Sequence, residues 1–276
     1  MAIKLRYPGP SFNGVAASQT ATLDLPVDRR YHNICLRFTS TDGSSAVQAV
    51  NEADVTQIRV IVDGKVQRTF SSRELFDINT LNGIAYSASL LPIYFSEPWR
   101  RSALDEESLA WATSNVSTFS VEVDLGAGAT GPALSSILTT DALQGPMQSI
   151  VKWHRRTIAA AGAGVVSYSD FPRRDTYLRQ HLSETAAADI TAVDVSVDNF
   201  TVLDVSDAQN SDYLADQAFA PVADNFHIVH DHTQRIADGL PMVKLNGRRV
   251  SDFRIDLTHA NTNNITVISE TLGNPD

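Results

Sequence analysis

The sequence predicts an all-β protein made of two tandem copies of one β domain, with a few short helices. Two observations predict it: apolar and polar residues alternate along most apolar segments, and the chain repeats itself at half its own length. Strict alternation buries one face of a strand and exposes the other, as in antiparallel sandwiches and barrels. No strand–helix–strand rhythm is present, which argues against a parallel α/β sheet.

The internal repeat consists of three pairs of matching segments in the same order. The strongest pair is DVTQIRVIVD at residues 54–63 and DITAVDVSVD at residues 189–198, which begins 135 positions later. The other pairs are residues 93–100 with 228–235 and residues 117–123 with 251–257. One such match between alternating segments would mean little. Three at nearly one offset indicate a tandem duplication.

Composition restricts the possible function classes. The 276 residues are 43% hydrophobic and 20% charged, which is typical of folded domains and leaves room for two of them. The net charge of −10 argues against a phosphate-binding surface and against adsorption to anionic lipid. Cys35 is the only cysteine, so no intramolecular disulfide is expected. The segment MAIKLRYPGPS holds no apolar core of signal-peptide length, so we expect synthesis in the cytoplasm without an export signal.

Strands are expected wherever the alternation is clear. In the first half these are residues 34–38, 58–62 and 119–125, and in the second half residues 193–197, 253–257 and 265–269. Asp63-Gly64 predicts a hairpin turn after the second strand, and Asp198-Asn199 occupies the equivalent place in the second copy. Asn246-Gly247 is a further hairpin candidate.

Helices are few. Ser102 is expected to cap a short helix that runs to Trp111, because acidic residues fill its first turn. Residues 173–182 and 209–219 are weaker helical candidates. The glycine- and proline-containing stretch 126–146 separates the halves, which predicts domains at residues 1–140 and 141–276.

Motifs for catalysis are missing from the sequence. His230 and His232 would share a face on a strand and form a plausible metal-binding pair, similar to the HxH of cupins. No Glu follows at the cupin spacing, however, and polar residues near a strand end are the simpler interpretation. No Gly-x-Ser-x-Gly elbow is present, and Cys35 reads as a strand residue. We therefore expect a protein that is not an enzyme.

Acids and amides cluster in two predicted loops. Carboxylate and amide oxygens of this kind suit calcium, although Asp and Asn are also common in turns for their backbone geometry. The two candidate sets are Asp77, Asn79 and Asn82, and Asp198, Asn199 and Asp204.

The segment 92–101, PIYFSEPWRR, is dense in aromatic residues, prolines and arginines. Its side chains either plug the end of a barrel or contact another subunit, since Trp and Arg concentrate at interface hot spots. Tyr94, Trp99, Arg100 and Arg101 are the candidate interface residues.

Several segments resemble one known family. The runs are IRVIVDGKVQRTF, LPIYFSEPWRR and WATSNVSTFSVEVDLGAG in the first half, and DFPRRDTYLRQHL and ITAVDVSVDN in the second. Together they resemble the major capsid protein of corticoviruses, the tailless icosahedral phages with an internal membrane. The likeness spans about residues 54–257 and is strongest over residues 54–128.

The resemblance implies two jelly-roll β-barrels in one chain. It further implies that three chains form a nearly hexagonal trimer, and that such trimers tile an icosahedral shell around a lipid membrane. Other capsid and membrane proteins of the virion would be partners, calcium would bind at or between capsomers, and nucleic acid would not be contacted directly. The acidic net charge agrees with that last expectation.

Two other functions are compatible with the sequence. A tandem β-sandwich carbohydrate-binding module would stack sugars on exposed Trp99, Trp111 and Trp153. A bicupin-like metalloprotein would use His230 and His232, but its motif is incomplete.

Overall fold

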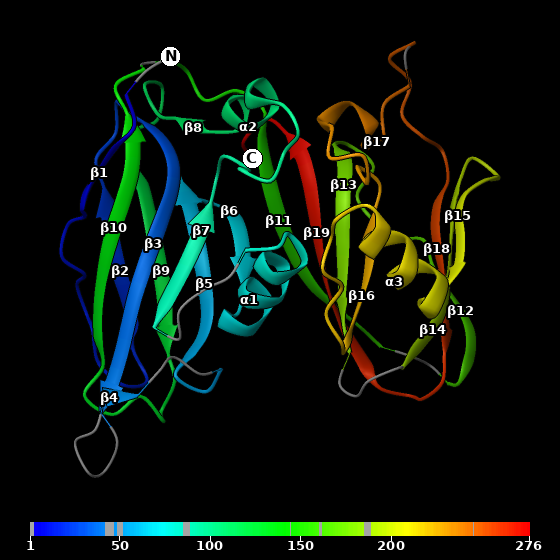
Figure 1. Ribbon diagram of the computed structural model, residues 1–276, viewed down its shortest axis with the longest axis horizontal. Helices are drawn as coiled ribbons and strands as arrows, with labels where there is room; N and C mark the ends of the chain where they lie inside the picture. Colours follow the sequence, from blue (N-terminus) through cyan, green and yellow to red (C-terminus); the bar gives the residue numbers. More distant parts are fainter. Residues whose placement is uncertain are drawn as a thin grey trace. The chain divides into compact units, whose positions relative to one another are not determined.

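The computed structural model describes residues 3–41, 47–48, 52–84, 89–143, 145–159, 162–184, 189–244 and 246–276 (Figure 1). The chain divides into two compact units. Unit 1 comprises Met1–Asn79, Ile84–Trp153 and Asn274–Asp276, and unit 2 comprises Thr80–Gly83 and His154–Gly273. Both are built mainly of antiparallel strands, and the described residues include three α-helices.

Unit 1 contains two sheets, each built on four main strands. The first has the order β1 (Leu5–Pro8), β10 (Ala133–Asp141), β3 (Arg30–Thr41) and β7 (Leu90–Tyr94), with the short strands β4 (Val47–Gln48) and β8 (Trp111–Ala112) also paired to β3. The second has the order β2 (Thr20–Leu25), β9 (Phe119–Leu125), β5 (Val55–Val62) and β6 (Lys65–Phe70).

Unit 2 repeats this arrangement. Its first sheet has the order β11 (Ile150–Ala159), β19 (Asn264–Gly273), β13 (Thr176–Ser183) and β16 (Asn225–Val229), with the short β17 (Leu240–Pro241) also on β13. Its second sheet has the order β12 (Gly164–Tyr168), β18 (Phe253–His259), β14 (Ile190–Val197) and β15 (Phe200–Ser206).

The two units therefore have the same topology. In chain order the equivalent strands are β1/β11, β2/β12, β3/β13, β5/β14, β6/β15, β7/β16, β9/β18 and β10/β19. Two such sheets form a jelly roll: the first strand lies beside the last, and consecutive main strands alternate between the sheets except at the β5–β6 and β14–β15 hairpins. The predicted double jelly roll is confirmed.

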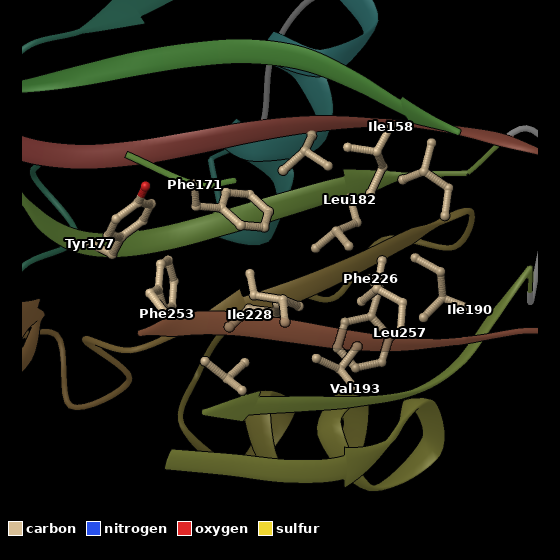
Figure 2. Close-up of a cluster of buried hydrophobic side chains, with 14 of the residues drawn as sticks. Ile158, Phe171, Tyr177, Leu182, Ile190, Val193, Phe226, Ile228, Phe253 and Leu257 are labelled. Carbon is tan, nitrogen blue, oxygen red and sulfur yellow. The ribbon is translucent and has the colours of Figure 1, made fainter. Parts of the chain in front are cut away.

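The alternating residues form the cores, as expected. In β3 of unit 1 the side chains of Ile34, Leu36 and Phe38 are fully buried. Figure 2 shows the core of unit 2, where Leu182 and Phe226 of one sheet face Leu257 of the other. Each large apolar side chain buried in this way contributes about 1.5–3 kcal/mol, so the alternation itself drives the two sheets together.

The helices agree only in part with the expectation. Helix α2 (Ala103–Ser108) follows Ser102 but ends before Trp111, and the Ser102 side chain makes no capping hydrogen bond. Helix α3 (Asp207–Asp216) lies where residues 209–219 were expected and begins with a Ser206–Gln209 capping box. Helix α1 (Ser72–Leu81) was not expected.

The helix predicted at residues 173–182 is wrong, because most of this segment is strand β13. Six consecutive residues of β13, from Tyr177 to Leu182, are buried on both faces of their sheet. A strand that is buried on both faces does not show alternation of apolar and polar residues. The sequence pattern of such a strand can therefore be mistaken for that of a helix.

Both predicted aspartate turns are confirmed. Asp63 and Gly64 have φ angles of 49° and 75°, and Asp198 and Asn199 have φ angles of 48° and 68°. Two successive left-handed residues make the tight turn that matches the twist of a two-stranded ribbon. Asp, Asn and Gly tolerate this backbone conformation best, which explains their presence here.

Candidate interaction surface

The outer edge of β6 in unit 1 is covered by the first residues of β11. Trp153 pairs with Arg68 in parallel register. The Arg68 Nε donates to the Val151 carbonyl at 2.8 Å. The Trp153 ring packs against Phe70 with centroids 5.0 Å apart.

Arg68 is the centre of this closure. Its side chain is almost fully buried, and its guanidinium lies 4.8–5.2 Å from the ring centroids of Phe95, Trp111 and Trp153. Its Nη1 also donates to the Tyr94 carbonyl at 2.6 Å. The space between β6 and β7 is thus filled. Because Trp111 and Trp153 are buried here, the expectation that they stack on sugars as exposed side chains is wrong.

The equivalent edge in unit 2 is open. Strand β15 pairs with β14, and the described residues provide no strand on its other side. At the 135-residue offset of the repeat, Leu203 and Val205 take the places of Arg68 and Phe70. Phe200 and Val202 on this strand are 77% and 46% exposed. An exposed apolar edge strand invites pairing with another chain.

A pocket of about 480 Å³ lies beside this edge, between β15, α3 and the segment that follows β16. Apolar side chains dominate its wall, and a few polar groups converge on it. The lining residues are Val202, Leu203, Val205, Asn210, Tyr213, Leu214, Val229, His230, His232, Asp238, Gly239 and Leu240. Val229 and His230 occupy the repeat positions of Tyr94 and Phe95, so the pocket is the counterpart of the space that Trp153 fills in unit 1.

The two histidines of the predicted metal pair both line this pocket but do not share a strand. β16 ends at Val229, and the His232 Nδ1 lies 3.0 Å from the Tyr213 hydroxyl. The Nε2 of His230 is buried without a hydrogen-bond partner, and burial lowers the pKa of His230 to about 4. Within the described residues no group of three or more His, Cys, Asp or Glu side chains is arranged to hold a metal ion.

The four predicted interface residues lie in different environments. Tyr94 and Trp99 pack edge to face with centroids 5.5 Å apart, and both are half-buried. Arg100 is buried and its Nη2 lies 2.7 Å from Glu97, so it acts inside the chain. Arg101 is exposed. Their role in subunit contacts stays a prediction. Trp99 and Arg101 are the better candidates, because their side chains are at least partly exposed.

The first predicted calcium set lies on and after a helix, so the expected loop is wrong. Asp77 forms an ion pair with Arg73 at 2.9 Å, and the Asn79 amide donates to the Pro92 carbonyl. The Asn82 Oδ1 accepts from Arg179 at 2.6 Å. The side-chain oxygens of Asp77 and Asn82 therefore already have partners. Calcium at this set stays a prediction.

The second calcium set does not form one cluster. Asp198 and Asn199 form the β14–β15 turn, where Lys244 forms an ion pair with Asp198. Asp204 lies on β15, in register with Asp194, which is itself in register with Asp256 on β18. Three carboxylates therefore stand in a row across the sheet.

Unit 1 balances the charge at the equivalent row. Arg59 takes the position of Asp194, and it forms ion pairs with Glu122 at 2.9 Å and Asp124 at 2.6 Å. Like charges directly opposite one another destabilise a sheet. In unit 2 the ion pair of Asp256 with Arg254 at 3.3 Å relieves part of this repulsion, but Asp194 stands in the middle of the row where unit 1 has a cation.

A buried polar chain crosses the first sheet of unit 2. The Nδ1 atoms of His181 and His227 are 3.0 Å apart, so one ring donates a proton to the other. The His181 Nε2 lies 3.4 Å from Glu270. Burial, followed by the nearby positive charges of His181 and Arg179, lowers the pKa of His227 well below its usual value. Burial alone would raise the pKa of Glu270, but its hydrogen bond and charge interaction with His181 outweigh this and lower it.

Sequence reasoning missed Arg68 and the pocket. The repeat could have pointed to both, because it aligns Arg68, which is buried, with Leu203 and so marks a difference between the two copies. None of the helices in the described ranges is both long and apolar enough to span a membrane.

Comparison with protein families matches nearly the whole chain. The model of the viral coat protein P2 N-terminal domain matches residues 7–141. The model of the viral coat protein P2 C-terminal domain matches residues 150–275. No curated protein sequence matches significantly.

Three solved structures with the same fold come from viruses. The major capsid protein P2 from bacteriophage PM2 has a TM-score of 0.88 at 19% identity, with 99% of this chain and 98% of that chain covered. A chain in the atomic structure of Sulfolobus Turreted Icosahedral Virus has a TM-score of 0.74 at 13% identity, covering 99% and 91%. A chain of the PBCV-1 virus capsid has a TM-score of 0.66 at 8% identity, covering 98% and 93%.

Proposed function

Because the chain belongs to the viral coat protein P2 family, a family of structural proteins of the viral capsid, we propose that it is a major capsid protein whose copies assemble as trimers. Each trimer presents six jelly rolls and has a nearly hexagonal outline. These capsomers tile an icosahedral shell. The observation that carries the proposal is that one chain holds two jelly rolls of identical strand order.

The duplication gives a geometric reason for three copies. A contact between different surfaces of two copies closes into a ring when the rotation allows it, and otherwise grows into a filament. Three copies of a duplicated chain approximate six-fold symmetry, which is the symmetry that most positions in a large icosahedral shell require. A single jelly roll would need six chains for the same object.

The shell is proposed to surround a lipid membrane, with other capsid and membrane proteins of the virion as partners. The net charge of −10 supports a shell that does not contact the genome, since neutralising nucleic acid requires clustered Lys and Arg. Calcium is proposed as a surface or inter-subunit ion, because carboxylates such as Asp204 and Asp194 stand in register on the sheet.

Light scattering coupled to size-exclusion chromatography tests the trimer. Three chains of 30.0 kDa give an expected species of 90.0 kDa. A strict monomer at every concentration would contradict the proposal. Cryo-electron microscopy of the particle tests the rest, with the expected result of hexagonal capsomers outside a bilayer density. A particle without a bilayer would remove the membrane from the proposal and leave the coat function.

A further inference from the structure

We propose that the open edge of β15, together with the pocket beside it, receives strand β1 of a second copy, in the way that β6 receives the start of β11 within unit 1. The inference rests on the proposed trimer and names the surfaces that hold it together. It commits to one occupant, the segment Ile3–Pro8 of the neighbouring copy.

The template for this contact is present in unit 1. There β11 pairs in parallel with β6 through Trp153 and Arg68, and the Val151 carbonyl accepts from the Arg68 side chain. The contact pairs Trp153 with Arg68 on the strand edge and packs the Trp153 ring against Phe70. A chain built from two copies of one fold offers the same edge twice, once on β6 and once on β15.

The edge of β15 resembles the edge of β6 without the strand that covers it. The pocket occupies the position at which Trp153 packs in unit 1, and Phe200 and Val202 extend the apolar surface along β15. The buried His230 Nε2 at the pocket wall has no hydrogen-bond partner, so it can form a hydrogen bond with a polar group that enters the pocket. An incoming strand brings both apolar side chains and backbone amides, which suit this combination.

Strand β1 is the counterpart of β11. Each is the first strand of its jelly roll, and each lies next to the last strand, β10 or β19. Among the described residues β1 pairs with β10 alone, so its outer edge is open as well. Ile3 and Leu5 are 81% and 49% exposed, which leaves apolar side chains of suitable size for the pocket.

The charges of the two surfaces are opposite. The segment at β1 carries the exposed cations Lys4 and Arg6; Lys4 forms an ion pair with Glu106 at 3.0 Å, so Arg6 is the main cation for this contact. The β15 side carries carboxylates on the strand, on α3 and at the pocket wall: Asp204, Asp207, Asp212, Asp216 and Asp238. Helix α3 has no Lys or Arg to offset them. Complementary charge of this kind selects the partner and its orientation.

A contact between different surfaces of two copies forms a ring when the rotation between copies closes, as the proposed trimer requires. In that ring every copy offers one β1 edge and one β15 edge, so three copies use all six of these edges. The ring thereby removes the aggregation risk that an apolar edge strand creates.

Disulfide trapping tests the contact directly. In a Cys35→Ser background, Val202→Cys is combined with Leu5→Cys or with Lys4→Cys, because successive side chains of a strand point to opposite faces. We expect one of the two pairs to give covalent trimers on a non-reducing gel after mild oxidation, without a ladder of larger species. Val165→Cys with Leu5→Cys is the matched control, since Val165 is 70% exposed on β12 at the other edge of the same sheet. It should stay monomeric on the gel.

A second variant makes the test independent of disulfide geometry. Val202→Lys places a cation on the edge that β1 should approach, and Val165→Lys is its control. We expect Val202→Lys to raise the concentration needed for trimers at least about tenfold with an unchanged far-UV spectrum, and the control to leave it unchanged.

The outcomes separate the two proposals. Trimers of 90.0 kDa that neither cross-link through Val202 nor weaken with Val202→Lys overturn this contact and leave the trimer standing. A wild-type chain that stays monomeric overturns both. Cross-linked trimers together with weakened Val202→Lys trimers establish the contact.

Discussion

Asp198 in unit 2 makes the same backbone contacts as Asp63 in unit 1, 135 positions earlier. The Asp63 Oδ1 accepts hydrogen bonds from the backbone amides of residues 117 and 118 at 2.7 and 2.9 Å. The Asp198 Oδ1 accepts from those of residues 251 and 252 at 2.8 and 3.0 Å. In both units a hairpin turn is thus fastened to the start of the neighbouring strand. The side chains reproduce the alignment that the sequence repeat suggested.

Asp198→Asn is expected to destabilise the protein in a pH-dependent way. Lys244, the Asp252 amide and Ser251 hold the pKa of Asp198 far below its usual value. A carboxylate whose pKa is depressed in the folded state contributes stability above its unfolded pKa of about 3.9, and that contribution is lost as pH falls below it. Thermal melts should show a gap between wild type and Asp198→Asn at pH 7 that shrinks in acid. A gap independent of pH would contradict the role of the charge.

Arg68→Leu is expected to lower the free energy of unfolding by about 3 kcal/mol, because it leaves two buried carbonyls without their charged donor. Arg68→Lys should recover part of this loss, since an ammonium keeps the charge but not the planar stack on three rings. Arg59→Leu is the control: Arg59 forms ion pairs on a half-exposed face, where a loss of only about 1 kcal/mol is expected. Urea unfolding followed by tryptophan fluorescence measures all three, and equal losses for Arg68→Leu and Arg59→Leu would refute the prediction.

His227→Gln is expected to make the protein less sensitive to mild acid. The folded state keeps His227 neutral, since its pKa is lowered there by burial and by His181 and Arg179. Stability is therefore fully present above the unfolded histidine pKa of about 6.5 and falls as pH decreases below it. Urea midpoints at pH 7.5 and pH 5 should differ less for His227→Gln than for wild type. His232→Gln, outside the buried pair, should retain the wild-type difference.

Asp194→Arg is expected to stabilise unit 2 by about 0.5–1 kcal/mol, because it replaces the middle carboxylate of a row of three by the cation found at Arg59. The gain should fade at about 1 M salt, where exposed charges are screened. Asp212→Arg on the exposed face of α3 is the control for net charge alone. If calcium binds at the row, it should raise the melting temperature of wild type and not of Asp194→Arg.

Trp99→Ala and Arg101→Ala are expected to weaken the trimer while leaving the monomer folded. Trp99 packs on Tyr94 and Arg101 is exposed, so both remain available to a neighbour. Arg100→Ala is a different case, since it strips Glu97 of a buried partner and should destabilise the chain itself. Sedimentation at several concentrations, with Arg37→Ala as the exposed control, measures the effect. Trimers as stable as wild type would show that this segment is not at the interface.

Much of the architecture was readable from the sequence because it depends on local rules. Residues 54–63 and 189–198 display alternation, and both aspartate turns carry residues that accept left-handed backbone angles. The repeat offset then implied two copies of one fold. Such features need no knowledge of distant contacts.

The failures come from places where distant contacts decide. Residues 173–182 became a strand because both of its faces are buried. The loop expected at Asp77 is a helix, where Asp77 pairs with Arg73, and His230 and His232 do not share a strand. Neither the burial of Trp111 and Trp153 around Arg68 nor the pocket beside β15 has a local signature.

The sequence by itself therefore determined the strands, the turns and the duplication, since these follow from periodicity and backbone preference within a few residues. Only the tertiary structure decided how the two copies differ. One edge is closed by Trp153 over Arg68, whereas the equivalent edge at Leu203 and Val205 is open beside a pocket. That difference depends on which strand lies next to which edge, and strand order is set by long-range packing of whole sheets rather than by any short run of residues.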